Sequence, residues 1–146
     1  MRRSEVMKLK WENINLHNKS LHLPKTKNGD PLDLPLSNFL FDLLSKRLES
    51  RQGSPYVFPS TGKTGHLVET KKFLQRVATN EIHIDDLRRT YSTVAESLDI
   101  PYYALKRLLN HRISGDVTSG YIVTSVERLR QPVELISRKL LQLKGE

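Results

Sequence analysis

Alternating hydrophobic and polar positions dominate the first third of the chain, after a short helical opening predicted over Ser4 to Lys10. The segment Asn13 to Leu23 repeats this alternation on both sides of Asn18-Lys19-Ser20. Because successive side chains of a strand point to opposite faces of a sheet, the spacing predicts a hairpin with one buried face.

A third strand is predicted directly after the hairpin. Lys27-Asn28-Gly29-Asp30 is a turn signal, and Leu32, Leu34 and Leu36 follow it at alternate positions. Pro35 lacks a backbone N–H and therefore suits an edge strand. The pattern predicts a small three-stranded antiparallel sheet near the N-terminus.

The hydrophobic spacing becomes helical from Ser37, which is a residue type favoured at helix N-caps. The predicted helix runs to about Ser50, and we expect it to cover the sheet or the core. Its apolar positions are Leu40, Leu43, Leu44 and Leu48. The following segment, Arg51 to Gly65, is rich in turn-forming residues and is typical of a loop, with one short extended stretch at Tyr56-Val57-Phe58.

The rest of the chain has the periodicity of consecutive helices. They are predicted over Val68 to Thr79, Asp86 to Leu98, Tyr102 to Leu109, Val117 to Ile122 and Ser125 to Leu143, with Pro101 at the start of the third. One apolar stripe marks the last helix, at Val126, Leu129, Val133, Ile136, Leu140 and Leu143, and Pro132 introduces a potential kink. We therefore expect an α+β fold, mainly α, in one domain spanning residues 1–146.

Positive charge narrows the classes of partner. The chain carries 24 Lys and Arg against 16 Asp and Glu, a net charge of +8. Seven of these basic residues precede Gly29 and face only Glu5 and Glu12 there. A polyanion is the natural partner, although charge alone leaves nucleic acid binding and simple solubility evenly matched.

The absence of cysteine excludes several kinds of site. With no Cys in the chain, disulfides, thiol nucleophiles and cysteine-bound zinc are excluded. No apolar stretch approaches the roughly 20 residues that span a bilayer. We expect a compact cytoplasmic protein without a membrane partner.

Three short segments far apart in the chain carry residues with chemical potential. They are Arg2-Arg3-Ser4-Glu5, Asp86-Leu87-Arg88-Arg89-Thr90, and Leu109-Asn110-His111 with Tyr121 ten residues further on. Each is weak alone. In this order, with a lysine-bearing hairpin between the first two and an amphipathic helix at the end, they resemble the catalytic domain of the tyrosine recombinase, or phage integrase, family.

The resemblance assigns roles near the N-terminus. The family's first box reads Thr-Gly-x-Arg-x-Ser-Glu, which matches Arg2 as the first catalytic arginine and Glu5 as its supporting acid. The family's hairpin lysine lies eight residues before the proline of the third strand, which selects Lys27 over Lys25. Lys25 and Arg3 are then expected to contact DNA phosphates.

The remaining roles fall in the second half of the chain. The family's second box, His-x-Leu-Arg-x-Thr, matches Arg88 as the second arginine and Thr90 as its companion. The third box, Leu-Gly-His, places His111 in the site, and the nucleophile of the family falls at Tyr121. Tyr102 and Tyr103 compete for that role, but their place at a helix start favours packing.

These residue types suit phosphodiester transfer. Two guanidiniums hold a phosphate by bidentate contacts, and a phenol in a cationic site ionises more readily. A lysine supplies the proton that the departing 5′ oxygen needs, and a histidine hydrogen bonds to the phosphate. The resemblance implies a covalent 3′-phosphotyrosine, and because that link conserves the bond energy, neither metal nor ATP is implied.

Asp85 departs from the family pattern. The position three before Arg88 is usually His, and His83 lies two residues earlier. A carboxylate near a phosphate is repulsive, so we expect Asp85 to cap the helix that carries Arg88, with His83 as a less favoured substitute in the site. We hypothesise that the replacement impairs activity.

The resemblance also sets expectations for the whole protein. It implies that the chain lacks the family's N-terminal DNA-binding domain and the residues before the first arginine, so that it alone binds DNA weakly and recombines little. It further implies double-stranded DNA with attachment-like sites as substrate and a tetramer of protomers on it. The last helix is expected to dock on its own domain, although in the family it tends to dock on a neighbour.

Two other functions stay open. One is a catalytically impaired DNA-binding remnant or fragment of a prophage integrase, which keeps the basic groove without turnover. The other is a basic helical interaction module whose motif match is accidental. Salt-dependent DNA binding separates the second from the rest, and covalent trapping separates an enzyme from a remnant.

Overall fold

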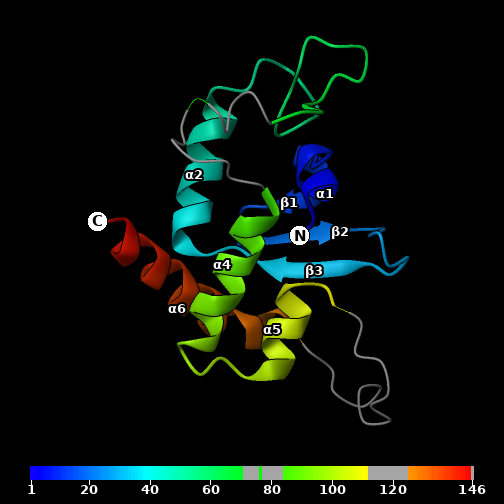
Figure 1. Ribbon diagram of the computed structural model, residues 1–146. Coiled ribbons are helices and arrows are strands. Elements are labelled where there is room, and N and C mark those ends of the chain that lie inside the picture. The colour runs from blue at the N-terminus through cyan, green and yellow to red at the C-terminus, as the bar shows by residue number, and fades with distance from the viewer. Residues whose placement is uncertain (71–75, 77–83, 112–124, 146) are drawn as a thin grey trace.

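The computed structural model describes residues 1–70, 76, 84–111 and 125–145 of the chain (Figure 1). The helix predicted over Val117 to Ile122 lies outside these residues, as does most of that predicted over Val68 to Thr79. Of its described residues, 68–70 belong to no helix, contrary to the prediction, and Arg76 is helical.

A three-stranded antiparallel sheet forms near the N-terminus, as predicted. Helix α1 (Arg3–Met7) and a short 3₁₀ helix η1 (Trp11–Asn13) precede the strands β1 (Ile14–Asn15), β2 (Ser20–Leu23) and β3 (Leu32–Pro35). The strand order is β1-β2-β3, which leaves β3 and its Pro35 at an edge.

The register of the sheet explains the alternation in the sequence. Leu21 pairs with Leu34 and Leu23 with Leu32, and all four side chains are buried, while His22 between them is exposed. The leucines therefore share one face of the sheet, and that face is the one turned to the core.

Helix α2 (Asn38–Glu49) begins where predicted but covers less of the core than expected. The Ser37 hydroxyl accepts a hydrogen bond from the Leu40 backbone N–H at 3.3 Å, which confirms the N-cap. Leu44 is buried, yet Leu40 and Leu43 are 41% and 51% exposed. The prediction that all these leucines cover the core is therefore wrong for Leu40 and Leu43, because α2 packs against the core only along the edge that carries Leu44.

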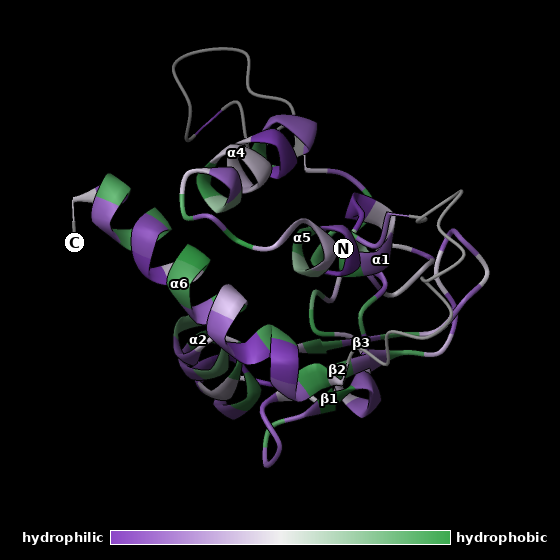
Figure 2. Ribbon diagram, turned by 90° about the horizontal axis from the view of Figure 1, so that it is seen from below, coloured by the Kyte–Doolittle hydropathy of each residue, from purple (hydrophilic) through white to green (hydrophobic). Residues whose placement is uncertain are grey.

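The last helix docks on its own domain. Helices α4 (Ile84–Glu96), α5 (Tyr102–Leu108) and α6 (Val126–Lys144) make up most of the second half, and α6 packs against β3, α4 and α5 (Figures 1 and 2). Leu129, Val133 and Ile136 on α6 are buried, as the stripe predicted. Pro132 lies inside the helix and is buried with them, whereas Leu143 at the far end is 63% exposed.

One hydrophobic core joins the sheet to the helices. It contains leucines of β2 and β3 together with Val94, Leu105, Leu108, Leu129 and Ile136. The expected α+β fold, mainly α, is confirmed. Within the described part of the chain, no helix is both long enough and apolar enough to cross a bilayer.

Candidate active site

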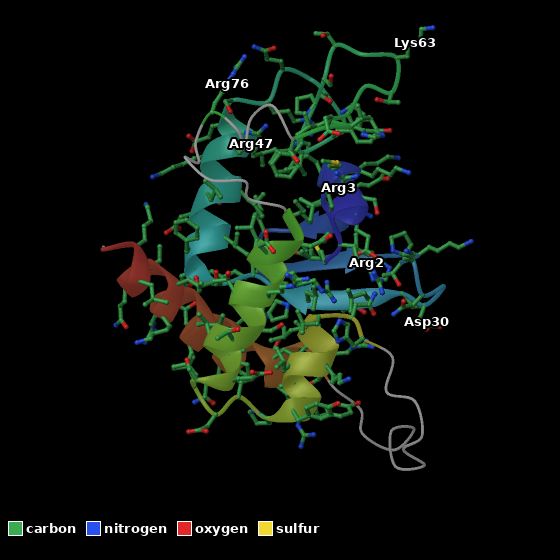
Figure 3. The ribbon with its side chains drawn as sticks, in the orientation of Figure 1. Arg2, Arg3, Asp30, Arg47, Lys63 and Arg76 are labelled. Atoms are coloured by element: carbon green, nitrogen blue, oxygen red, sulfur yellow. The ribbon has the colours of Figure 1, made fainter. Side chains whose placement is uncertain are left out.

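The first arginine is anchored at the start of α1. Arg2 is the N-cap residue, and its backbone N–H donates to Glu5 Oε2 at 2.6 Å. Its guanidinium Nη1 lies 3.6 Å from Glu5 Oε1, and the Glu5 side chain is only 8% exposed. Glu5 therefore holds both the backbone and the charge of Arg2, as the prediction of a supporting acid requires. Figure 3 labels Arg2 and its exposed neighbour Arg3.

The lysine-bearing turn between β2 and β3 reaches the same carboxylate. The Lys27 backbone N–H donates to Glu5 Oε1 at 3.2 Å. Gly29, with φ +93°, lets the turn reverse tightly, and Thr26 closes the turn through Asp30. Lys25 and Lys27 are both exposed, but Lys27 is the one whose backbone binds Glu5 beside Arg2.

Arg88 of α4 is half-buried and held by carbonyls from two distant segments. Its Nη1 donates to the Met1 carbonyl at 3.3 Å, and its Nη2 donates to the Leu109 carbonyl. Burial lowers the pKa of Arg88, and the nearby positive charge of Arg2 lowers it further. The Arg88 guanidinium is therefore anchored next to residue 2, and the positive charges of the two arginines act on each other.

His111 follows α5 beside these arginines. Asn110 adopts φ +51°, a left-handed conformation that Asn tolerates better than most residues, and it ends the helix where the family box carries glycine. The His111 backbone N–H donates to the Lys106 carbonyl at 2.9 Å. Burial lowers the pKa of His111, as do the charges of Arg88, Lys106 and Arg2. The imidazole is therefore neutral at pH 7.

Asn28 joins the site without having been predicted. Its Oδ1 accepts from Arg2 Nη2 at 3.0 Å, and its Nδ2 donates to the Asn110 carbonyl at 2.8 Å. In the sequence, Asn28 is explained entirely as a turn former before Gly29. The two long-range hydrogen bonds of the Asn28 side chain leave no signal in the sequence, because residues 2, 28 and 110 come together only in the folded protein.

Three buried side-chain nitrogens make no hydrogen bond within the described residues. They are Arg2 Nη1, Arg107 Nε and Asn110 Nδ2. A buried donor without an acceptor is costly. Arg2 Nη1 meets Glu5 only as an ion pair at 3.6 Å, so the guanidinium keeps hydrogen-bonding capacity that Glu5 does not use.

Asp85 is not the N-cap of α4. It lies inside the first turn of a helix whose described part begins at Ile84, so the capping prediction is wrong. The carboxylate is exposed, and its charge favours the protonated form of Arg88. An acidic residue in the first turn also stabilises the helix through its dipole. His83 lies outside the described residues.

Among the described residues, the predicted Thr90, Arg3 and Lys25 are not brought into this cluster. Thr90 is exposed, and its hydroxyl donates to the Asp86 carbonyl at 2.9 Å, a bond within α4. Arg3 and Lys25 are exposed, as surface contacts with DNA would require. Tyr121 lies outside the described residues.

Other tyrosines in the described part of the chain are engaged elsewhere. Burial raises the pKa of Tyr91 to about 12, the opposite of what a nucleophile needs. Tyr102 is 69% exposed, and its ring lies 5.0 Å from the Lys106 ammonium. The packing role expected for Tyr102 agrees with this cation–π contact.

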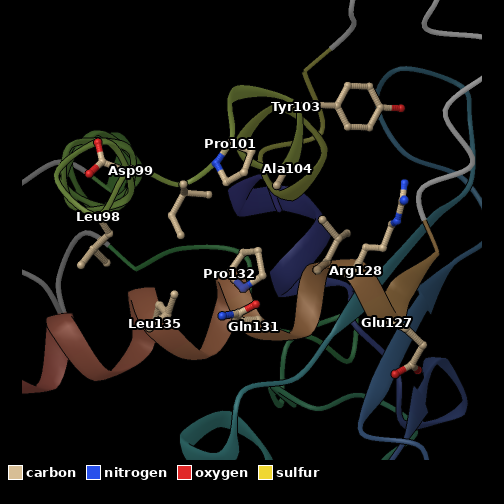
Figure 4. Close-up of a pocket in the computed structure, with 12 residues that line it drawn as sticks. Leu98, Asp99, Pro101, Tyr103, Ala104, Glu127, Arg128, Gln131, Pro132 and Leu135 are labelled. Atoms are coloured by element: carbon tan, nitrogen blue, oxygen red, sulfur yellow. The ribbon is translucent and has the colours of Figure 1, made fainter.

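A separate hollow of about 620 Å³ lies between the α4–α5 connection and α6 (Figure 4). Apolar side chains including Leu98, Pro101, Ala104 and Leu135 line it. Arg2, Arg88 and His111 do not line it, so it is distinct from the cluster described above.

Known recombinases and integrases are similar to this chain in sequence. The chain is 34% identical over 89 residues to a shufflon-specific DNA recombinase of Escherichia coli, covering 60% of this chain and 22% of that protein. It is 24% identical to the prophage integrase IntF of E. coli K12, covering 99% of this chain and 32% of the relative. The chain thus spans about a fifth to a third of the length of these relatives.

A solved structure shares the fold. The integrase from mycobacterium phage Brujita superposes with a TM-score of 0.71 at 18% identity, over 93% of this chain and 47% of that one. The model of the phage integrase family matches residues 1–128. With most of its length matched, the chain belongs to the phage integrase family.

Proposed function

We propose that the chain is the catalytic domain of a tyrosine recombinase, which cleaves and rejoins DNA through a 3′-phosphotyrosine. The observation that carries the proposal is the meeting of Arg2, Arg88 and His111 from three distant segments. Paired guanidiniums suit a phosphodiester in the transition state, because its negative charge grows there.

The two arginines bind the scissile phosphate. Arg2 and Arg88 offer planar guanidinium groups suited to phosphate oxygens. Neutral His111 donates one further hydrogen bond. Both guanidiniums are held by Glu5, Asn28 and backbone carbonyls, so they lose less conformational freedom on binding than free side chains would.

The Tyr121 phenol gives its proton to solvent water, its oxygen forms a bond to phosphorus, and the bond from phosphorus to the 5′ oxygen breaks. The electron pair of that bond goes to the 5′ oxygen, which receives a proton from the Lys27 ammonium. The reverse reaction, with a 5′ hydroxyl from another strand, rejoins DNA. The link keeps the energy of the broken bond, so the scheme needs no ATP or metal.

The proposed partners follow from this chemistry. Double-stranded DNA with attachment-like sites is the substrate, and exposed Arg3 and Lys25 extend the basic surface toward its backbone. Exchange of strands between two duplexes requires several active sites, which supports further protomers on the DNA, a tetramer by resemblance. The proposed compartment is the cytoplasm.

Asp85 favours one alternative, a DNA-binding remnant with impaired catalysis. Its exposed carboxylate interacts electrostatically with Arg88, where the family has a basic residue. Asp85→His should then raise the cleavage rate, since it removes a repulsive charge from the phosphate site. Equal rates for the two proteins would contradict the impairment.

A covalent trapping experiment tests the main proposal. The chain is incubated with nicked duplexes that carry a randomised central sequence, so that cleavage releases a short oligonucleotide and the covalent adduct accumulates. We expect an adduct on a denaturing gel that Tyr121→Phe abolishes and that Tyr102→Phe, a matched control at an exposed tyrosine, leaves intact.

Each other result selects a different function. Salt-dependent DNA binding without an adduct would replace the enzyme with the remnant. Absence of both binding and adduct would overturn a DNA function and leave the interaction module. An adduct that survives in Tyr121→Phe would assign the nucleophile to another residue.

A further inference from the structure

We propose that Asn28 is a positioning residue that fixes the Lys27 turn against Arg2 and against the segment carrying His111. The inference rests on the proposed strand-transfer function, in which Lys27 protonates the departing oxygen. It concerns a residue whose type and place in the sequence are fully explained by the turn alone.

The Asn28 amide makes two long-range hydrogen bonds at once. It accepts from Arg2 Nη2 at 3.0 Å across 26 residues of sequence, and donates to the Asn110 carbonyl at 2.8 Å across 82 residues. A primary amide has both an acceptor and a donor end, so it can serve a guanidinium and a carbonyl together. Neither a carboxylate nor an ammonium can do so.

The turn itself is tied into a single unit. The buried Thr26 hydroxyl donates to the Asp30 carbonyl at 3.0 Å and accepts from the Asn28 backbone N–H at 3.3 Å. The Gly29 backbone N–H donates to the Thr26 carbonyl at 2.9 Å. Fixing the Asn28 side chain therefore fixes the backbone of its neighbour Lys27 as well.

The two arginines lie at the ends of one chain of contacts. Arg2 bonds to Asn28, Asn28 bonds to the Asn110 carbonyl, and the preceding carbonyl, that of Leu109, accepts from Arg88. The left-handed φ of Asn110, +51°, lies between the two carbonyls and orients them. Asn28 thus sets the position of the lysine turn relative to both phosphate-binding arginines.

A second anchor keeps the turn nearby when Asn28 is changed. The Lys27 backbone N–H remains bonded to Glu5 Oε1 at 3.2 Å. Loss of the Asn28 amide should therefore loosen the turn rather than unfold it. Lys27 would be present but misplaced, and a displacement of about 1 Å in a catalytic group can cost on the order of 100-fold in rate.

The proposed positioning of Lys27 as proton donor is tested with a substrate whose leaving group needs no proton. The experiment uses the preferred sequence recovered by covalent trapping, once with the normal 5′ oxygen and once with sulfur in its place. A thiol has a pKa of about 8.5, so a thiolate leaves without a general acid. We expect Asn28→Ala to slow cleavage of the oxygen substrate about 10- to 100-fold and that of the sulfur substrate by less than about threefold.

Three variants make the comparison quantitative. Lys27→Ala should show the same pattern more strongly, because it removes the proton donor itself. Asn28→Asp keeps the acceptor for Arg2 but loses the donor to Asn110, and should fall between wild type and Asn28→Ala. Asn18→Ala is the matched control, since Asn18 lies in the other turn and bonds to Arg130 through its backbone carbonyl.

Equal slowing of both substrates by Asn28→Ala would overturn the positioning role, because a general structural defect does not distinguish the leaving groups. An unchanged rate on the oxygen substrate would overturn it also. Absence of an adduct from wild type on either substrate would instead overturn the proposed function.

Amide hydrogen exchange tests the anchoring contact without catalysis. Asn28→Ala should speed exchange of the Lys27 amide by about tenfold, since the turn then opens more often, while Asn18→Ala should not. An unchanged exchange rate in Asn28→Ala would show that the amide does not hold the turn.

Discussion

The two turns of the small sheet differ in what their long-range hydrogen bonds attach them to. At the β1–β2 turn, Arg130 of α6 donates to the carbonyls of Lys19 and Asn18, at 3.1 and 2.8 Å. At the β2–β3 turn, the Asn28 amide bonds to Arg2 and to the Asn110 carbonyl. One end of the sheet is attached to the last helix, and the other end to the candidate active site.

The two ends of this sheet therefore have different roles, one in stabilising the fold and the other in the candidate active site. The Arg130 contacts fix the start of α6, whose inner face supplies Leu129 and Ile136 to the core. The Asn28 contacts fix a lysine and an arginine that are proposed to meet DNA. We therefore expect changes at the first turn to affect folding, and changes at the second to affect cleavage by correctly folded protein.

The largest expected effect is in Arg2→Lys, at the arginine that Asn28 of the second turn contacts. Lysine keeps the charge beside Glu5 but loses the guanidinium fork, so both the Asn28 bond and bidentate phosphate binding are lost. We expect adduct formation to fall about 100- to 1,000-fold with the melting temperature almost unchanged. Gel quantification together with thermal unfolding checks this. Arg3→Lys, at an exposed neighbour, is the control and should lose little.

The next effect is at the first turn, in Arg130→Ala. The substitution leaves the carbonyls of Asn18 and Lys19 without this donor and frees the start of α6. We expect the melting temperature to fall by about 4 °C. Adduct per folded molecule should stay the same. A loss of cleavage by Arg130→Ala with no fall in melting temperature would contradict the proposal that the two turns have different roles.

The smallest effect concerns the charge of His111. Burial and the neighbouring cations hold the pKa of His111 below 6.5, so the folded chain binds fewer protons than the unfolded chain just below that value. The associated stability is present above pH 6.5 and is lost as the pH falls through the lowered pKa. Lys106→Gln removes one of these cations and should raise the pKa of His111.

A titration of the His111 ring by NMR measures this shift. Lys139→Gln on α6 is the control, since Lys139 is not among the charges that act on His111. A His111 pKa that stays the same in Lys106→Gln would show that Lys106 does not contribute to the cationic field of the site.

The predictable parts of the molecule are those encoded in short stretches of chain. The alternation around Leu21 and Leu34 predicted the sheet, and Ser37 predicted the start of α2 at its observed N-cap. The family motifs pointed to Arg2, Arg88 and His111, which the structure brings together. The roles of these residues, and of Tyr121, stay predictions until the trapping experiment.

Two errors share one physical cause. The spacing of Leu40 and Leu43 is helical, but periodicity does not tell which edge of α2 meets the core, and these residues are exposed. Asp85 is a good cap by residue type, yet the described helix already includes Ile84 before it. Local preference is weak, about 1 kcal/mol for a cap, and the surrounding structure overrides it.

The sequence by itself determined the elements and the chemical types of the site, because strand and helix periods and turn preferences act over a few neighbouring residues. Tertiary structure alone decided that the Asn28 amide joins Arg2 to Asn110, and that Glu5 serves both Arg2 and Lys27. Partners separated by 82 residues meet only after the core has packed, and hydrogen bonds require placement within a few tenths of an ångström.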